Sequence, residues 1–386
     1  MFCGMLGVGI IAPLLPLYVH GMGATGLWLG MIFSAHGISN TITTPIVGRL
    51  SDRRGRKIFL CTGLFSYGII ALGYIWASNV SQLSLIRFLQ GIAGAMIIPV
   101  AQAYVGDLSP EGEEGKWMGY AHAAFFSGFG FGPIIGGTLT EHFGMNIGFY
   151  CMSGLTLLAF LIATAFLPEV ISGRTERRHR LSFSEMGKSG MIRGLFSVRL
   201  GQALGRASIM TFLPIFAGIY IGLSTSLIGI LVTTNIMVVS ILAPLGGRLA
   251  DRFSRKALTV LGSIIFFASL AAIPWAHNFW QLLALGLSQG VGGVISMPAT
   301  NALAVEEGRR FGMGSTMSIL MMAMTLGMTV GPLLAGLVVD FINIDSVFYF
   351  GGGIGLIGAI LFIWFTKQYS PPELTLDSQH KSTNEH

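Results

Sequence analysis

The sequence predicts an all-α polytopic membrane protein with 12 transmembrane helices, arranged as two six-helix pseudo-symmetric halves. Composition, the length of the apolar blocks and an internal repeat predict this class. The 386 residues are 52% hydrophobic and only 10% charged, whereas a soluble domain carries about 25% charged residues. The apolar residues fall in blocks of about 20, the length of a helix that crosses a hydrocarbon core. The blocks lack the alternation of barrel strands, so a helical bundle is expected.

The apolar blocks place the spans in order along the chain. They cover residues 1–19, 27–48, 58–77, 82–106, 117–140, 146–167, 200–222, 227–247, 257–276, 279–303, 313–339 and 346–366. Pro13 and Pro16 interrupt the first block, and no small-x-small cleavage site follows it. We therefore expect a true first helix rather than a signal peptide.

The basic residues indicate the orientation. They follow spans two, six, eight, ten and twelve or precede span five, and the opposite loops contain no Lys or Arg. The positive-inside rule then predicts a multi-pass protein of the cell inner membrane with both termini in the cytoplasm. The net charge of +6 is thus an orientation signal, and no module that binds nucleic acid accompanies it. Cys3, Cys61 and Cys151 lack metal or redox spacing, so we expect no metal site and no cofactor.

A shift of 199 residues lays the second half of the chain on the first without a gap. Matched pairs include Gly30 with Gly229, Pro45 with Pro244, Gln90 with Gln289 and Gly132 with Gly331. One constant offset from span two to span eleven indicates duplication. The predicted organisation is a first bundle over residues 1–167, a cytoplasmic linker over 168–199, a second bundle over 200–366 and a cytoplasmic tail over 367–386. Two parallel halves around a central cavity predict alternating access by rocking.

The loop after span two resembles the best-known signature of the major facilitator superfamily. Residues 48–57 read G-R-L-S-D-R-R-G-R-K, against the family pattern G-x-L-a-D-r-x-G-r-k, and residues 247–256 carry a second copy with Ser254 in place of Gly55. The resemblance implies a cytoplasmic latch that holds the outward-open state. The alternative is a basic loop whose charges only set the orientation of the protein in the membrane. The latch candidates are Gly48, Asp52, Arg53, Gly55, Arg56, Lys57, Asp107, Gly247, Asp251, Arg252, Arg255, Lys256 and Glu306.

Spans four and five carry two further motifs. Residues 87–95 resemble the family motif R-x-x-q-G-x-g-a, which makes Arg87 and Gln90 candidates for proton coupling. An Arg inside a span normally turns inward or pairs, although Arg87 also lies within snorkelling reach of the headgroups. Residues 128–137 match the family's antiporter motif, with Gly128, Gly132, Pro133, Gly136 and Gly137. Glycines at spacing four also form a smooth packing face, so export by antiport rests on the resemblance alone.

No acidic residue lies near mid-membrane, which weakens the case for a proton-coupled drug exporter. Other coupling candidates are His36 and His122, which titrate near neutral pH but equally suit helix packing. Glu141 and Asp340, repeat partners at the outer span ends, are further candidates. The cavity candidates are Arg206, Phe125, Phe126 and Asn235. Arg206 lies about four residues into the hydrocarbon on the cytoplasmic side of span seven, where it either snorkels or favours a neutral or anionic substrate.

These features predict a secondary active transporter working by alternating access, with proton-coupled export of small organic molecules or drugs as the first hypothesis. Its partners would be a small-molecule substrate, protons and the lipid bilayer, and we expect a monomer. An uptake symporter or a sugar or organic-anion porter on the same fold is the first alternative, because fold does not fix substrate. A non-transporting membrane scaffold or receptor is an alternative of another class. No enzyme motif stands out, so catalysis is not predicted.

Overall fold

The computed structural model describes residues 1–110, 113–169, 186–187 and 189–367, and its regular elements are all helices. The first half contains α1 (Phe2–Ile11), α2 (Leu14–Gly21), α3 (Gly26–Arg54), α4 (Arg56–Trp76), α5 (Val80–Ala95), α6 (Ile98–Leu108), α7 (Glu114–Phe143) and α8 (Asn146–Phe166). The second half contains α10 (Gly190–Ile215), the π-helical turn η1 (Phe216–Tyr220), α11 (Thr225–Arg252), α12 (Arg255–Ala271), the 3₁₀ turn η2 (Ile273–Trp275), α13 (Phe279–Phe311), α14 (Met313–Phe341) and α15 (Ile344–Thr366).

Twelve crossings account for these helices, which agrees with the predicted fold class. Ten of the described helical segments are long and apolar enough to span a membrane, and α3 and α12 supply the other two crossings. Two crossings are broken rather than continuous as predicted. The first breaks between α1 and α2 at Ala12 and Pro13, where the proline ring removes a backbone donor. The fourth breaks at Met96 and Ile97, just before α6 begins.

The predicted start of the seventh span is wrong by ten residues. Helix α10 begins at Gly190, and the Ser189 hydroxyl caps it by accepting a bond from the Ile192 N–H at 3.4 Å. Residues 190–199 are therefore helical rather than part of the predicted linker. Arg206 becomes the seventeenth residue of α10, about 24 Å along the helix. The predicted linker residues 170–185 and 188 and tail residues 368–386 lie outside the described residues.

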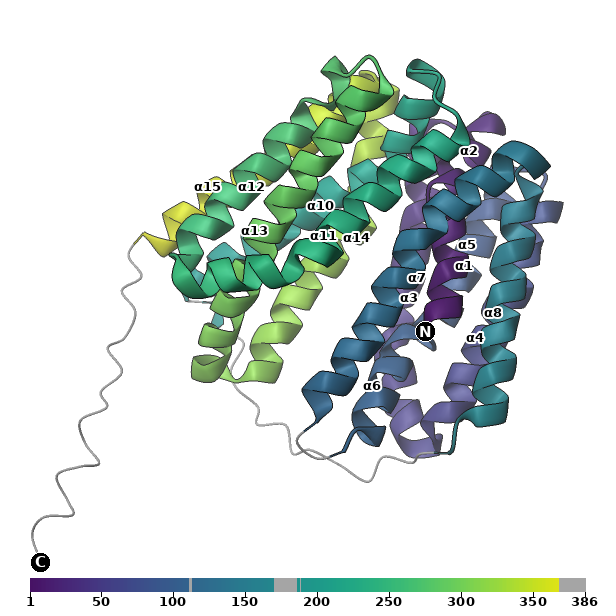
Figure 1. Ribbon diagram of the computed structural model, residues 1–386, viewed down its shortest axis with the longest axis horizontal. Coiled ribbons are helices and arrows are strands. Elements are labelled where there is room, and N and C mark those ends of the chain that lie inside the picture. The colour runs from purple at the N-terminus through teal and green to yellow at the C-terminus, as the bar shows by residue number, and fades with distance from the viewer. Residues whose placement is uncertain (111–112, 170–185, 188, 368–386) are drawn as a thin grey trace, which may run out of the picture.

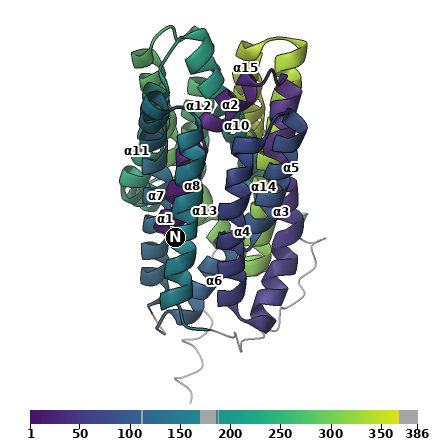
Figure 2. The ribbon, with the colours of Figure 1, turned by 90° about the vertical axis from the view of Figure 1, so that its right-hand side faces the viewer.

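The two halves use the same internal packing, as the 199-residue repeat predicts. Helix α7 packs along α1 and α14 along α10, while α3 pairs with α5 and α11 with α13. One end of the bundle, here called the basic end, contains the junctions α3–α4, α6–α7, α11–α12 and α13–α14 with their Lys and Arg residues. Figure 1 shows the ribbons of the two halves side by side at the opposite end and diverging toward the basic end, and Figure 2 shows the molecule from the side of the first half.

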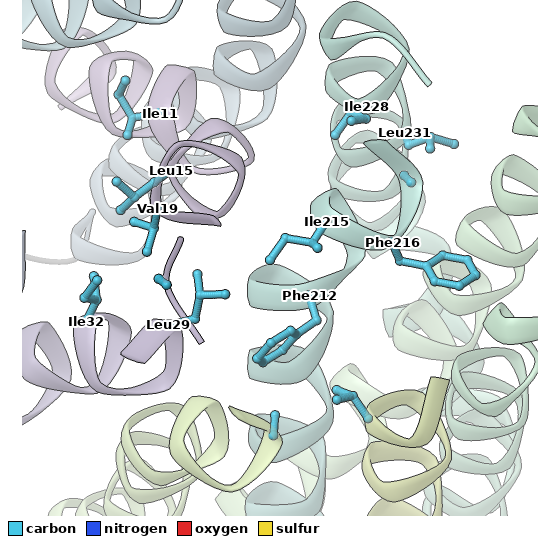
Figure 3. Packing of buried hydrophobic residues seen from close by; sticks show 14 of the residues in the cluster. Ile11, Leu15, Val19, Leu29, Ile32, Phe212, Ile215, Phe216, Ile228 and Leu231 are labelled. Atoms are coloured by element: carbon cyan, nitrogen blue, oxygen red, sulfur yellow. The ribbon is translucent and has the colours of Figure 1, made fainter. Parts of the chain in front are cut away.

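The hydrophobic core is shared between the halves only near the opposite end. There one large cluster joins Leu15 and Val19 of α2 and Leu29 of α3 to Phe212 of α10 and Ile228 of α11 (Figure 3). The smaller clusters nearer the basic end each lie within one half. Because burial of apolar surface is the main attractive force between such side chains, the halves are sealed together at one end and separately packed at the other.

Candidate functional site

A cavity lies between the halves. Its walls come mainly from α10, α11 and α13 of the second half, with Ala12, Pro13, Phe126 and Phe129 of the first half completing it. Three of the four residues proposed from the sequence as cavity residues, Arg206, Phe126 and Asn235, line this space. It is mostly apolar with a few polar groups, the usual character of a small-molecule site.

The polar side chains that line this central cavity include the guanidinium of Arg206 and the amides of Asn235 and Gln289. The Asn235 amide donates to the Gly286 carbonyl at 2.9 Å, which links α11 to α13. Gln289 is only 3% exposed, and its Nε2 has no hydrogen-bond partner in the structure. None of the described Asp or Glu residues lines the cavity, so the charge of Arg206 has no carboxylate partner there.

A second cavity lies within the first half. His36 and Phe125 line it, together with Asn40, Tyr67 and Phe129, and Phe129 also borders the central cavity. The Nδ1 atom of His36 is buried and has no partner. His122, the other histidine candidate, is exposed and lines neither cavity. The structure therefore brings only one of the two histidines to a cavity.

Arg87 lies beside His36 in the polar centre of the first half. Its guanidinium sits over the Phe33 ring at 4.9 Å from the centroid, and its Nε has no hydrogen-bond partner. The repeat places Asn235 at the position of His36 and Gly286 at that of Arg87. The same contact between helices is therefore cationic in the first half and a neutral amide–carbonyl bond in the second.

Gln90 and Gln289 occupy equivalent positions but have different partners. Gln90 is buried, and its Oε1 accepts a hydrogen bond from the Tyr74 hydroxyl at 2.6 Å. The repeat partner of Tyr74 is Ile273, which has no hydroxyl to offer Gln289. Gln90 thus belongs to a packed polar cluster, whereas Gln289 faces the central cavity.

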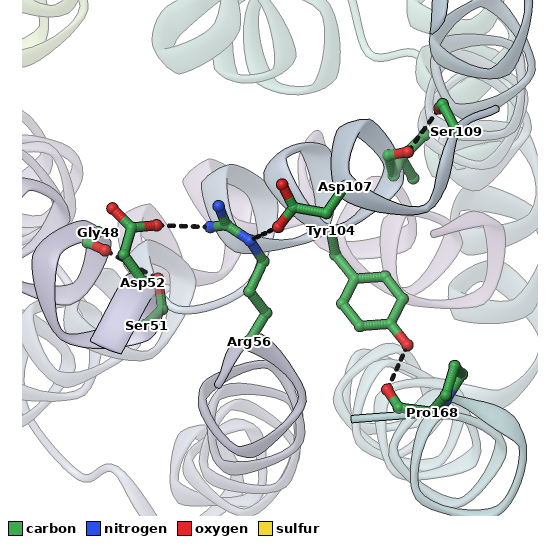
Figure 4. Close-up of polar contacts among 9 residues, drawn as sticks. Gly48, Ser51, Asp52, Arg56, Tyr104, Asp107, Ser109 and Pro168 are labelled. Carbon is green, nitrogen blue, oxygen red and sulfur yellow. Dashed lines mark hydrogen bonds and ion pairs between the residues drawn. The ribbon is translucent and has the colours of Figure 1, made fainter. Parts of the chain in front are cut away.

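The latch candidates Gly48, Asp52, Arg56 and Asp107 of the first half lie together at the basic end (Figure 4). Arg56 is buried and pairs with two carboxylates: its Nη1 lies 3.0 Å from Asp52 Oδ1, and its Nε bonds Asp107 Oδ2. Gly55 joins α3 to α4 with φ of +97°, which a side chain would strain. A Cβ on Gly48 would meet nothing within 4 Å, so this glycine is not needed for a close contact in the conformation seen. Arg53 and Lys57 complete the basic turn.

The second copy of this turn is looser. Arg255 reaches Glu306 at 3.4 Å, the equivalent of the Arg56–Asp107 pair, but both side chains are partly exposed. No ion pair joins Asp251 to Arg255 among the described residues. Ser254 replaces Gly55 in an ordinary backbone conformation and caps α12 by accepting a bond from the Ala257 N–H. The remaining members are Gly247, Arg252 and Lys256, whose Nζ donates to the Thr366 carbonyl at 3.3 Å.

The glycine motif of α7 forms two contact faces. A Cβ on Gly128, Gly132 or Gly136 would collide with α1, so the spacing of four does provide the smooth face expected for a neighbouring helix. Gly137 instead faces Thr225 of α11 in the other half, and the Pro133 carbonyl meets Gly229. The motif therefore packs its own half and also joins the two halves.

Six hydrogen bonds join the two halves among the described residues, and all lie in the part of the bundle toward the opposite end. Asp340 at the end of α14 accepts bonds from the Gly26 and Leu27 N–H groups at the start of α3, at 2.7 and 2.8 Å. Glu141 at the end of α7 accepts a bond from the Ser226 N–H at the start of α11, at 3.1 Å. These carboxylates, considered from the sequence as proton sites, cap helices of the other half.

Sequence reasoning missed three features of this site. Gln289 was recognised only as the repeat partner of Gln90, and that match was the available signal for it. Phe129 and Phe266 line the central cavity, but apolar residues in apolar spans carry no distinguishing pattern.

The described residues contain no cluster of His, Cys, Asp or Glu able to hold a metal ion.

The geometry agrees with comparisons with known proteins. The profile of the Major Facilitator Superfamily matches residues 1–201 and again residues 195–384, once for each half. Multidrug resistance protein 2 of Bacillus subtilis is 29% identical, over 95% of this chain and 94% of its own. Quinolone resistance protein NorA of Staphylococcus aureus is 26% identical, over 94% of each chain. A bacterial homolog of the human lysosomal transporter Spinster, solved in an inward-facing and occupied conformation, shares the fold with a TM-score of 0.80, 14% identity and 96% coverage of both chains.

Proposed function

Because the chain belongs to the Major Facilitator Superfamily, whose members are transporters rather than enzymes, we propose that it exports small organic molecules in exchange for protons by alternating access. The observation that carries the proposal is the asymmetry of the contact between the halves. They share hydrogen bonds and a core only toward the opposite end, around a cavity that both halves line. Rocking the halves about this cavity would close the basic end and open the other.

In this proposal the basic end faces the cytoplasm of the cell and both termini are cytoplasmic. The distribution of Lys and Arg supports this orientation, since every loop at the opposite end lacks them. The conformation described here is then inward-facing. One chain supplies all walls of the cavity, which supports a monomer as the transporting unit.

The basic-end cluster around Arg56 would act as the latch of the outward-facing state. In the conformation seen, its two ion pairs among the described residues, Arg56 with Asp52 and Arg56 with Asp107, lie within the first half. The open space around Gly48 and Gly247 leaves room for the other half to approach when the basic end closes. The latch would thus form its contacts between halves only in the alternate state.

Export, rather than uptake, is supported by the complete glycine motif of α7 and by relatives named for multidrug and quinolone resistance. The motif places Gly137 and Pro133 at the contact that closes the opposite end. A seam of small residues there permits tight closure, which would limit leakage of protons and substrate through the inward-facing state.

We assign proton coupling to the first half. Among the described residues that line either cavity, His36 is the one histidine, the side-chain type whose intrinsic pKa lies near neutral pH. A proton on its imidazole would place a second positive charge beside Arg87, and repulsion between them would favour a conformation that separates them or admits a counter-charge. Arg87, Gln90 and Tyr74 then hold the polar surroundings in which this proton is bound.

The test is transport by the purified protein in proteoliposomes across an imposed pH gradient. A proton-coupled exporter accumulates substrate in vesicles that are acidic inside. A symporter accumulates it when the outside is acidic, and a scaffold or receptor accumulates nothing under either gradient. The sign of the effective gradient therefore separates all three hypotheses.

A further inference from the structure

We propose that the central cavity recognises amphipathic organic anions, with Arg206 and Gln289 binding the carboxylate or sulfonate head and the surrounding apolar residues binding the body. The inference rests on the proposed transport function, which it deepens by naming the substrate class. A cavity that binds cationic compounds would instead present a carboxylate to its ligand.

The first argument is the uncompensated charge of Arg206. It lies about 24 Å from the start of α10 and lines the cavity. A charge held this deep in a membrane protein is costly unless it pairs or reaches water. Among the described residues no Asp or Glu borders the cavity. A ligand carboxylate would supply the missing partner and accept the bidentate hydrogen bonds that a guanidinium donates.

The second argument is the state of Gln289, which is independent of that charge. Its side chain is 97% buried, faces the same cavity and leaves its Nε2 donor without an acceptor. An unpaired buried donor destabilises the protein, so a ligand acceptor there is favoured. The equivalent Gln90 is held by Tyr74, whereas Ile273 stands at the tyrosine position in the second half. Both glutamines have a buried Nε2 without a partner, but of the two only Gln289 lines the central cavity.

The apolar wall indicates the rest of the ligand. Phe126 and Phe129 of the first half face the cavity together with Met210, Leu213 and Phe266 of the second half. Aromatic and thioether side chains bind flat hydrocarbon bodies of varied shape. Because both halves contribute, a ligand held by Arg206 would contact both, as alternating access requires of its substrate.

A second arginine marks the approach from the basic end. Arg199 precedes Arg206 by seven residues, two helical turns on the same side of α10 and about 10.5 Å away. Its partner is the neutral Asn301 amide rather than a carboxylate. A substrate anion that enters from the basic end would thus pass Arg199 before it reaches Arg206.

The charge of the substrate also sets the electrical behaviour of the exchange. Export of one monovalent anion for one imported proton moves two positive charges inward, so an inside-negative potential drives it. Exchange of a monovalent cation for one proton moves none. The voltage dependence of transport therefore reports the substrate class independently of affinity.

The test uses a matched naphthalene series: 2-naphthoate, 2-naphthamide and 2-naphthylmethylammonium. Binding to the full-length protein in nanodiscs is measured by titration calorimetry against empty nanodiscs. We expect 2-naphthoate to bind at least about tenfold more tightly than the other two, the effect of one charge-assisted contact. Arg206→Gln and Gln289→Glu should each weaken 2-naphthoate about tenfold or more and leave 2-naphthamide within about twofold.

Arg309→Gln, the same change at an exposed position of the basic end, is the matched control and should alter nothing. Arg206→Lys keeps the charge, so it should retain preference for the anion even if Arg206→Gln does not fold. Tighter binding of the ammonium compound, an equal loss for all three compounds in Arg206→Gln, or no binding of 2-naphthoate would overturn the proposal. Gradient-driven transport of the ammonium compound alone would refute the substrate class and keep the transport function. Binding of 2-naphthoate without transport would support the substrate class and refute the transport function.

Discussion

The carboxylate of Asp340 caps the first turn of α3 by accepting hydrogen bonds from the N–H groups of Gly26 and Leu27, 314 and 313 residues away in the sequence. A residue of the second half thus satisfies free donors at a helix start of the first half. Glu141 and Ser226 form the same relationship in the other direction. A negative charge at a helix N-terminus is stabilising, so the two caps favour closure of the opposite end.

Asp340→Asn should weaken this closure. The reporter is Ser34→Cys, a buried position at the contact between the halves, in a protein lacking Cys3, Cys61 and Cys151. We expect its modification by a membrane-impermeant thiol reagent to accelerate about fivefold, because loss of the charge at the helix end removes about 1 kcal/mol. Asp345→Asn, which changes a carboxylate within the first turn of α15, is the control. Equal rates in the two variants would argue against the caps.

Arg56→Ala should destabilise the protein more than Arg255→Ala does. Arg56 is buried between Asp52 and Asp107, whereas Arg255 is partly exposed and has one partner at 3.4 Å. Loss of charge-assisted hydrogen bonds at the buried site costs about 1.5–3 kcal/mol, while exposed pairs contribute little. Thermal unfolding of the two variants in the same detergent measures the difference. Equal melting temperatures would show that the repeat copies are energetically equivalent.

Arg87→Ala should abolish transport and leave a folded, inserted protein. The contact of Arg87 with Phe33 is worth about 0.5–2 kcal/mol, and the repeat partner Gly286 shows that the scaffold tolerates loss of the side chain. Initial transport rates in proteoliposomes and size-exclusion profiles are the measurements. Phe33→Leu removes the ring and keeps the cation, so it should still transport. Normal rates in Arg87→Ala would refute a role for this arginine.

His36→Asn introduces the residue that the repeat carries at Asn235. The amide preserves polarity and removes the titratable group. We expect substrate counterflow without a gradient to persist and accumulation driven by a pH gradient to disappear. His122→Asn changes a histidine that lines neither cavity and should behave as the unaltered protein. Undiminished gradient-driven accumulation in His36→Asn would show that the coupling proton does not bind to His36.

Much of the fold could be predicted because membrane spans follow from local composition. The constant offset of 199 residues also anticipated equivalent contacts, such as Arg56 with Asp107 and Arg255 with Glu306. The start of α10 was missed because residues 190–199 include Arg193 and Arg199, which lower the hydropathy of a helix that extends beyond the apolar core.

The site could be predicted only where a residue is exceptional within its span. Arg87, Arg206 and His36 stood out as polar groups among apolar ones. The cap of Asp340 on Gly26 joins segments more than 300 residues apart, and no local pattern encodes such a contact. Gln90 and Gln289 both have a buried Nε2 without a partner, and only the packed structure shows that Gln289 is the one that lines the central cavity.

The most direct test of the central claim, proton-coupled export by alternating access, is accumulation of labelled small organic molecules, the naphthalene series included, in proteoliposomes that are acidic inside. The membrane potential is held at zero with potassium and valinomycin. We predict accumulation of at least one compound above its external concentration, lost when a protonophore collapses the gradient and absent in Arg87→Ala. Accumulation only when the outside is acidic, or none under either gradient, would contradict the account.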